Sequence, residues 1–276
     1  MTLHEPMKGS LLKIGIFDSG SGGLSVLREI LRILPKEKYV YYSDNANCPY
    51  GEKSVEFIRN RAREITRLLI SKGAQIIVVA CNTATAAAIS VLREEFPVKF
   101  IGMEPAVKPA ALSSKTGVIG VLATAGTLKA SRYLNIKEMF GDGTKIAEHV
   151  GEGFVELVEN GILDGPEAEE TVRKSVLPLV AAGADRIVLG CTHYPFLRKV
   201  IERVAGPGVQ VIDPAPAVAR HLAEVMKQEG LLDHEYADVP AAEEIELIAS
   251  GPELPARRLL DTIISGHAGR QTATKA

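Results

Sequence analysis

Residues 75–86 read QIIVVACNTATA, and a closely similar segment follows later in the chain. The apolar residues 76–80 precede Cys81 without alternating with polar ones, which is typical of a short strand buried on both faces of a sheet. Asn82, Thr83 and the alanines around them are typical of a helix N-terminus. We therefore expect Cys81 at the carboxyl end of a central strand, where open α/β sheets bind ligands.

The second segment, residues 183–194, reads GADRIVLGCTHY, against GAQIIVVACNTA at residues 73–84. Both fit the pattern G-A-x-x-I-V-x-x-C, and the two cysteines, Cys81 and Cys191, are 110 residues apart. A buried strand that ends in cysteine and occurs twice indicates that the chain contains two related halves.

Other predicted strand ends recur at a similar spacing. The strands at 11–17, 39–43, 76–80 and 98–102 have counterparts at 117–122, 145–149, 187–190 and 209–212. The last pair ends in similar tripeptides, Glu104-Pro105-Ala106 and Asp213-Pro214-Ala215. We interpret this pattern as a duplicated α/β unit, and the alternation of strands with helices predicts parallel sheets with right-handed crossovers.

The predicted fold is α/β, with two pseudo-symmetric doubly wound domains whose mainly parallel sheets face each other across a cleft. Residues 10–106 and 217–266 are expected to form the first domain, which carries Cys81, and residues 107–216 the second, which carries Cys191. In the C-terminal part we expect a helix at 218–230, a strand at 244–249 and a helix at 256–264, packed on the first domain. Residues 267–276 are small and polar, and we expect a disordered tail.

Length and composition exclude several classes of protein. The 276 residues are 46% hydrophobic and 24% charged, as in ordinary globular proteins, and a net charge of −2 argues against a nucleic-acid partner. No apolar run reaches membrane-spanning length, so no membrane partner is expected. The N-terminus lacks the apolar core of a secretory signal, and three cysteines are an odd number for a disulfide framework. We therefore predict a cytoplasmic protein with reduced thiols.

A glycine-rich segment, DSGSGG at residues 18–23, joins the first strand to a helix at 24–34. It lacks the G-x-G-x-x-G pattern and no Walker lysine follows, so nucleotide binding is the weaker alternative. We favour a tight turn that presents Asp18 and Ser19 to a site.

The loop DNANCPYG, residues 44–51, follows the second strand. Pro49 and Gly51 indicate a turn that aims Tyr50 at the site, and an ordinary surface loop is the alternative. Cys48 has no counterpart in the other half, so we interpret it as incidental. The charges of the following helix, residues 54–72, are interpreted as a solvated face.

Two lobes that each present a thiol suit inversion at a carbon, because one group removes a proton from one face and another delivers a proton to the opposite face. A thiol, with a pKa of about 8.5, is well placed for such acid–base work. Two cysteines that only pack are one alternative. A metal site of Cys81, Cys191 and His193 is another, but the C-x-H spacing does not match the usual zinc sites. We expect no metal and no organic cofactor, since no lysine lies in a motif suited to a pyridoxal Schiff base.

Five segments together resemble the glutamate racemases: FDSGSGGLSVL, SDNANCPYGEKS, VVACNTATA, GVLATAGTLKAS and VLGCTHYPFL, within a similarity that runs from Ile14 to Ala217. Asn47 departs from the arginine that many members carry in its loop. The resemblance implies a cofactor-independent isomerase that interconverts L- and D-glutamate and supplies D-glutamate for peptidoglycan in cell-wall synthesis. We also expect a homodimer.

The resemblance also implies the roles of individual residues. Cys81 would act on D-glutamate, assisted by Asp18 and Asp44, and Cys191 would act on L-glutamate, assisted by Glu159 and His193. The expected substrate-binding residues are Asp18, Ser19, Tyr50, Gly51, Asn82, Thr83, Thr124, Thr192 and His193.

Two other functions are weighed against this one. A racemase for aspartate or another amino acid belongs to the same superfamily, but the tyrosine loop and the T-H-Y-P segment favour glutamate. A two-lobed amino-acid binding protein would explain the duplication and the cleft, but not the paired cysteines.

Overall fold

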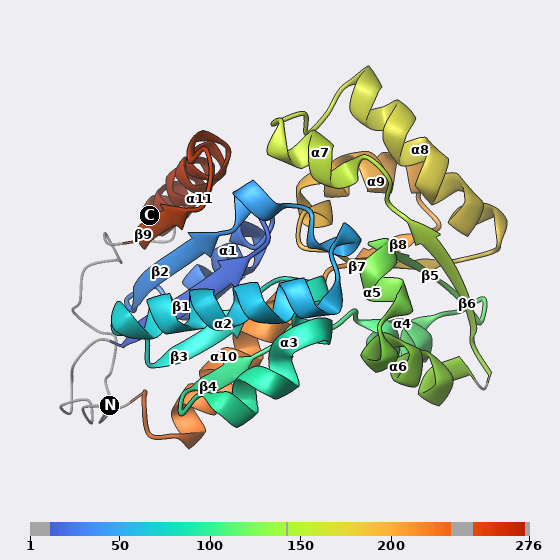
Figure 1. Cartoon of the computed structure of the whole chain (residues 1–276). Helices are drawn as coiled ribbons and strands as arrows, with labels where there is room; N and C mark the ends of the chain where they lie inside the picture. Colours follow the sequence, from blue (N-terminus) through green and yellow to red (C-terminus); the bar gives the residue numbers. More distant parts are fainter. Residues whose placement is uncertain (1–11, 142, 233–244, 274–276) are drawn as a thin grey trace.

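The computed structural model describes residues 12–141, 143–232 and 245–273, which form two parallel sheets flanked by helices (Figure 1). The predicted α/β fold with two doubly wound units is confirmed. None of the helices in these described ranges is long and apolar enough to cross a membrane.

The first sheet has the strand order β4-β3-β1-β2-β9, and all its pairings are parallel. Its strands are β1 Lys13–Asp18, β2 Lys38–Ser43, β3 Ile76–Val79, β4 Lys99–Ile101 and β9 Ile245–Ala249. The apolar segment that forms β3 is buried along its whole length, which is why the sequence shows no alternation there.

The second sheet has the strand order β6-β5-β7-β8, again with parallel pairings. Its strands are β5 Val118–Ala123, β6 Lys145–Val150, β7 Arg186–Gly190 and β8 Gln210–Ile212. This order repeats β2-β1-β3-β4 of the first sheet, so β3 and β7 occupy equivalent central positions. The two thiols that follow these strands are therefore related by the duplication, as the repeated sequence predicts.

Helices cover both faces of each sheet. The α-helices are α1 Leu24–Ile33, α2 Val55–Ser71, α3 Asn82–Glu95, α4 Val107–Ser113, α5 Ala125–Lys129, α6 Ser131–Gly141, α7 Phe154–Glu159, α8 Pro166–Ala181, α9 Arg198–Ala205, α10 Ala215–Gln228 and α11 Leu254–Ala273. Short 3-10 helices lie at η1 Asn45–Asn47, η2 Tyr50–Glu52 and η3 Tyr194–Leu197. In the first lobe α2 packs beside α3 and α1 packs beside α10.

The C-terminal part returns to the first sheet, where β9 pairs with β2 at the edge and α10 and α11 pack on α1 (Figure 1). The predicted boundary between the two domains lies at residue 217, but helix α10 begins earlier, at Ala215. The domain limits therefore stay a prediction. Residues 11 and 244 of the predicted strands lie outside the described residues, as do residues 10, 142 and 233–244 of the predicted domains.

Helix α11 is longer than the predicted helix at 256–264 and continues to Ala273, through most of the tail for which we expected disorder. Two glycines, Gly266 and Gly269, favoured an earlier end in the sequence because glycine lowers helix propensity. Residues 274–276 of the expected tail lie outside the described residues.

Candidate active site

A buried cavity lies between the two lobes, at the carboxyl ends of β3 and β7. It is lined by Ser19, Pro49, Tyr50, Gly51, Cys81, Asn82, Thr83, Thr124, Val155, Gly190, Cys191, Thr192 and His193. Every residue that we expected to bind substrate is in this lining except Asp18. The predicted helpers Asp44 and Glu159 are not in the lining either, and Val155 of α7 is a lining residue that the sequence analysis missed.

Cys81 is the N-cap residue of α3. Its sulfur accepts a hydrogen bond from the backbone N–H of Ala84 at 3.4 Å, and its thiol donates to Ser19 Oγ at 3.7 Å. Burial raises the pKa of this thiol, and the nearby charge of Asp18 raises it further, while the N–H of Ala84 lowers it. The helix N-terminus therefore stabilises a thiolate that its buried surroundings disfavour.

Cys191 follows β7 and lies beside an imidazole–carboxylate pair. Its sulfur is 3.8 Å from Nδ1 of His193, and Nε2 of His193 is 2.7 Å from Oε1 of Glu159. Burial lowers the pKa of His193, but hydrogen bonds with Cys191, Cys48 and Glu159 outweigh burial and raise it well above the usual value. The arrangement favours an imidazolium ion held between a sulfur and a carboxylate.

The glycine-rich turn lets the second lobe approach the first closely. A Cβ atom at Gly20 would lie 2.3 Å from Oε1 of Glu159, and one at Gly22 would lie 2.3 Å from Nδ1 of His193. In the same turn, the backbone N–H and hydroxyl of Ser21 donate to the carboxylate of Glu159 at 2.6 and 2.8 Å. The glycines are therefore needed for contact between the lobes.

Asp18 is fully buried and organises this turn. Its carboxylate accepts hydrogen bonds from the backbone N–H of Gly23 at 2.9 Å and from the hydroxyl of Thr192 at 3.3 Å. Burial raises the pKa of Asp18, and the charge of His193 lowers it. The carboxylate thus joins the start of α1 to the second lobe.

Asp44 is also fully buried, and its partners lie in the first lobe. Arg61 of α2 donates two hydrogen bonds to it, from Nε at 3.0 Å and from Nη2 at 2.7 Å, and the hydroxyl of Tyr50 donates a third. Burial acts to raise the pKa of Asp44, but the hydrogen bond from Arg61 and the others lower it below its usual value. The pair of Asp44 and Arg61 therefore fixes Tyr50 in the cavity wall.

Polar side chains in and beside the cavity wall differ in whether they have hydrogen-bond partners. The hydroxyls of Thr83, Thr124 and Thr127 lie within 3.0–3.2 Å of one another and connect α3 of the first lobe with α5 of the second. Asn82 is 3% exposed, yet within the described part of the chain neither atom of its amide group has a hydrogen-bond partner. A buried amide in a cavity wall is suited to bind a polar ligand.

Cys48 lies closer to this site than its interpretation as incidental suggested. Its sulfur, a carboxylate oxygen of Glu159 and a ring nitrogen of His193 lie within 4.8 Å of one another. Residues of both lobes make this contact, so the sequence around Cys48 contains no signal for it.

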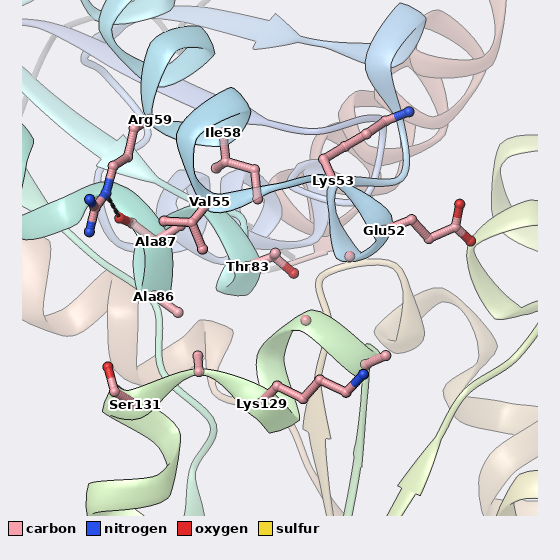
Figure 2. Close-up of a pocket in the computed structure, with 14 residues that line it drawn as sticks. Glu52, Lys53, Val55, Ile58, Arg59, Thr83, Ala86, Ala87, Lys129 and Ser131 are labelled. Carbon is pink, nitrogen blue, oxygen red and sulfur yellow. Dashed lines mark hydrogen bonds between the residues drawn. The ribbon is translucent and has the colours of Figure 1, made fainter.

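The cavity is narrow, with a volume of about 10 Å³, which is room for about one water molecule. A wider pocket of about 400 Å³ lies beside it and shares Gly51 and Thr83 with its lining. Figure 2 shows this pocket between the two lobes, with Val55 and Ile58 on one side and Lys129 and Ser131 on the other. Entry of a larger molecule into the cavity requires the walls between the two spaces to move apart.

Comparison with known proteins gives consistent results. The family model described as Asp/Glu/Hydantoin racemase matches residues 14–222. A glutamate racemase from Methylococcus capsulatus is 47% identical over 94% of this chain and 94% of its own length.

Solved structures with bound glutamate are also similar to this chain. The Escherichia coli glutamate racemase in complex with L-glutamate and the activator UDP-MurNAc-Ala is 33% identical, with a TM-score of 0.79 over 93% of this chain and 95% of that one. The Francisella tularensis glutamate racemase in complex with D-glutamate is 26% identical, with a TM-score of 0.77 over 92% and 94% of the two chains.

Proposed function

The chain belongs to the Asp/Glu/Hydantoin racemase family, and from this premise we propose that it is a glutamate racemase that uses two cysteines and no cofactor. The observation that carries the proposal is the position of Cys81 and Cys191. They follow equivalent strands of opposed lobes and line one cavity. A molecule bound there has one thiol on each side.

In the proposed reaction the thiolate of Cys81 removes the α-proton of D-glutamate and becomes a thiol. The electron pair of the broken C–H bond stays on the substrate as a carbanion that its carboxylate stabilises. The thiol of Cys191 then delivers its proton to the opposite face, which forms L-glutamate and leaves a thiolate. The reverse reaction begins at Cys191, and exchange with solvent restores the starting protonation.

The neighbours of each thiol support this division of work. The N-terminus of α3 favours the thiolate of Cys81, and Nδ1 of His193 lies 3.8 Å from the sulfur of Cys191, close enough to exchange a proton with it. We propose that Glu159 keeps the imidazole oriented and charged, so that His193 can pass a proton to Cys191 between turnovers. Asp18 and Asp44 are 0% exposed and make fixed hydrogen bonds, so we assign them positioning roles on the Cys81 side.

The cavity wall suits a diacid. Its described lining contains no arginine or lysine, but backbone N–H groups at helix starts and several hydroxyls can bind carboxylates. The amide of Asn82 has a donor and an acceptor for the amino acid. The two relatives crystallised with L- and D-glutamate support the choice of a five-carbon substrate, and the pocket beside Gly51 and Thr83 is the proposed entrance.

The main alternative is racemisation of aspartate. The ratio of kcat/KM for glutamate to that for aspartate distinguishes the two functions. A site that pairs donors with both carboxylates of glutamate leaves one set unpaired when the shorter diacid binds, so we expect kcat/KM for aspartate to be lower by about 100-fold or more. Comparable values for the two substrates would contradict the assignment to glutamate.

We further propose that the protein acts in the cytoplasm as a homodimer and supplies D-glutamate for peptidoglycan. Family membership supports this role. Complementation of a bacterial strain that cannot make D-glutamate tests it. Expression of the chain should allow growth without added D-glutamate, while a Cys81→Ala variant should not. Sedimentation of the purified protein measures the oligomeric state.

The decisive experiment follows racemisation of each enantiomer by circular dichroism with a metal chelator present. Activity should persist, and in deuterated water the early product should carry deuterium at the α-carbon while the recovered substrate does not. Loss of activity that added metal restores would overturn the cofactor-independent reaction. Equal early label in substrate and product would overturn the two-base mechanism.

A further inference from the structure

Cys48, Glu159 and His193 form a compact cluster of metal-ligating groups that the proposed reaction does not use as a unit. Their ligand atoms lie within 4.8 Å of one another. Cys48 comes from the loop after β2 in the first lobe, Glu159 from the end of α7 and His193 from the segment after β7 in the second. We propose that these three residues form a zinc-binding site between the lobes, beside the substrate cavity.

The ligand set fits zinc in both chemistry and charge. Zinc binds thiolate, imidazole and carboxylate ligands in tetrahedral sites, whereas magnesium and calcium prefer oxygen ligands. One thiolate and one carboxylate balance the two positive charges of the ion, with a neutral imidazole. Three protein ligands leave the fourth position to water, as in sites that are not purely structural.

The ligand atoms must shift to bind one ion, because they lie within 4.8 Å of one another. Nε2 of His193 and Oε1 of Glu159 are 2.7 Å apart in their hydrogen bond. Bonds of about 2.0–2.3 Å to one ion place tetrahedral ligands somewhat farther apart than this, so the metal replaces the shared proton and the two side chains separate slightly. Gly20 lies directly against Glu159 and Cys48, and its lack of a side chain leaves the space between them open.

Neighbouring groups already support the ligands. Ser21 donates its backbone N–H and its hydroxyl to the carboxylate of Glu159, which holds it in place from the side of the first lobe. The other ring nitrogen of His193 lies beside Cys191. Such partners orient metal ligands and raise metal affinity. His193 is 2% exposed, but Glu159 is 19% exposed and Cys48 is half-buried, so an ion can reach the site from solvent.

Cobalt titration of the metal-free 276-residue chain tests the proposal, because a cobalt–thiolate bond gives a charge-transfer band in the near ultraviolet. We expect the band in the wild type, its displacement by Zn²⁺, and its loss in Cys48→Ser. The variants Cys81→Ser and Cys191→Ser should keep the band, since their thiols are not the proposed ligand. Competition with a chelator should show that Cys48→Ser lowers zinc affinity by about tenfold or more.

Other outcomes overturn the site. A band that survives in Cys48→Ser but disappears in Cys191→Ser would place the metal between the catalytic thiols. No cobalt band in the wild type, with no zinc binding in the chelator competition, would show that the cluster holds no metal. Far-ultraviolet circular dichroism checks that each variant is folded, and Cys48→Ala provides a second variant without a possible oxygen ligand.

Discussion

At the scale of single residues, the two thiols have unlike surroundings although their strands are equivalent. Cys81 has the N-terminus of a long helix, α3, while Cys191 is followed by the 3-10 helix η3 and has His193 and Glu159 beside it. Equivalent strands thus position the two sulfurs, and the residues that follow each strand give each sulfur different neighbours.

Replacing either thiol tests whether both are needed. Cys81→Ser and Cys191→Ser should each lower kcat for racemisation by about 100-fold to 10,000-fold. Both directions should be affected, because every turnover needs one base and one acid. Cys81→Ser should still exchange the α-proton of L-glutamate, through Cys191, which proton NMR in deuterated water measures. Full activity of either variant would exclude its thiol from the mechanism.

Zinc occupancy at the proposed metal site should inhibit racemisation, because it takes His193 away from its exchange with Cys191. We expect Zn²⁺ to inhibit the wild type reversibly, with activity restored by a chelator. Cys48→Ser should need about tenfold more zinc for the same inhibition. Equal sensitivity of the two proteins would show that any inhibition arises elsewhere, for example at the catalytic thiols.

At the scale of elements, one charged residue of helix α2 does not belong to a solvated face. Arg61 is 22% exposed and binds the buried carboxylate of Asp44, whereas Arg63, two residues along the same helix, pairs with Glu95 at the surface. In the sequence, Arg61 and Arg63 lie among the other charged residues of the helix, and nothing local separates them. Only the position of α2 against the loop after β2 distinguishes them, and that contact is not encoded locally.

Arg61→Gln should destabilise the protein by about 3 kcal/mol, because it leaves the buried carboxylate of Asp44 without its cation. It should also raise KM, since Tyr50 loses its fixed position in the cavity wall. Arg63→Gln is the matched control and should change stability and KM much less. Urea unfolding and steady-state kinetics measure both effects, and similar losses in the two variants would refute the special role of Arg61.

The effect of Arg61→Gln should depend on pH. The folded-state pKa of Asp44 is lowered, so its ion pair contributes stability above the unfolded-state pKa of about 3.9 and loses it as pH falls through the folded value. The difference in free energy of unfolding between wild type and Arg61→Gln should therefore be constant near neutrality and narrow below about pH 4. A difference that stays constant down to pH 3 would mean that Asp44 is not the group involved.

The strands before the thiols were largely predictable from the sequence, whereas the partners of Asp44 and Cys48 were not. The apolar segments before Cys81 and Cys191 predicted β3 and β7 because a strand buried on both faces needs such residues. The positions of Asp44 and Cys48 depend on partners distant in sequence, Arg61 for one and Glu159 for the other. No local pattern indicates such contacts.

At the scale of the whole molecule, the lobes are joined by hydrogen bonds as well as by the chain. Ser21 binds Glu159, Asp18 binds Thr192, and Thr83 contacts Thr124, each pair crossing from one lobe to the other. A continuous apolar core also includes buried residues of both sheets, among them Ile16 and Leu189. The repeat in the sequence predicted two units but not how closely they are coupled.

This coupling predicts that the two lobes unfold together. Differential scanning calorimetry should show one transition, and saturating L- or D-glutamate should move the whole transition upward, because residues of both lobes line the proposed binding cavity. At a glutamate concentration of about 100 times Kd, the stabilisation is about 2.7 kcal/mol, which corresponds to a rise of about 5 °C in Tm. Asn82→Ala removes an amide from the cavity wall and should show a smaller shift at the same concentration. Two transitions of which glutamate moves only one would mean that the lobes are independent and that the ligand is held by one of them alone.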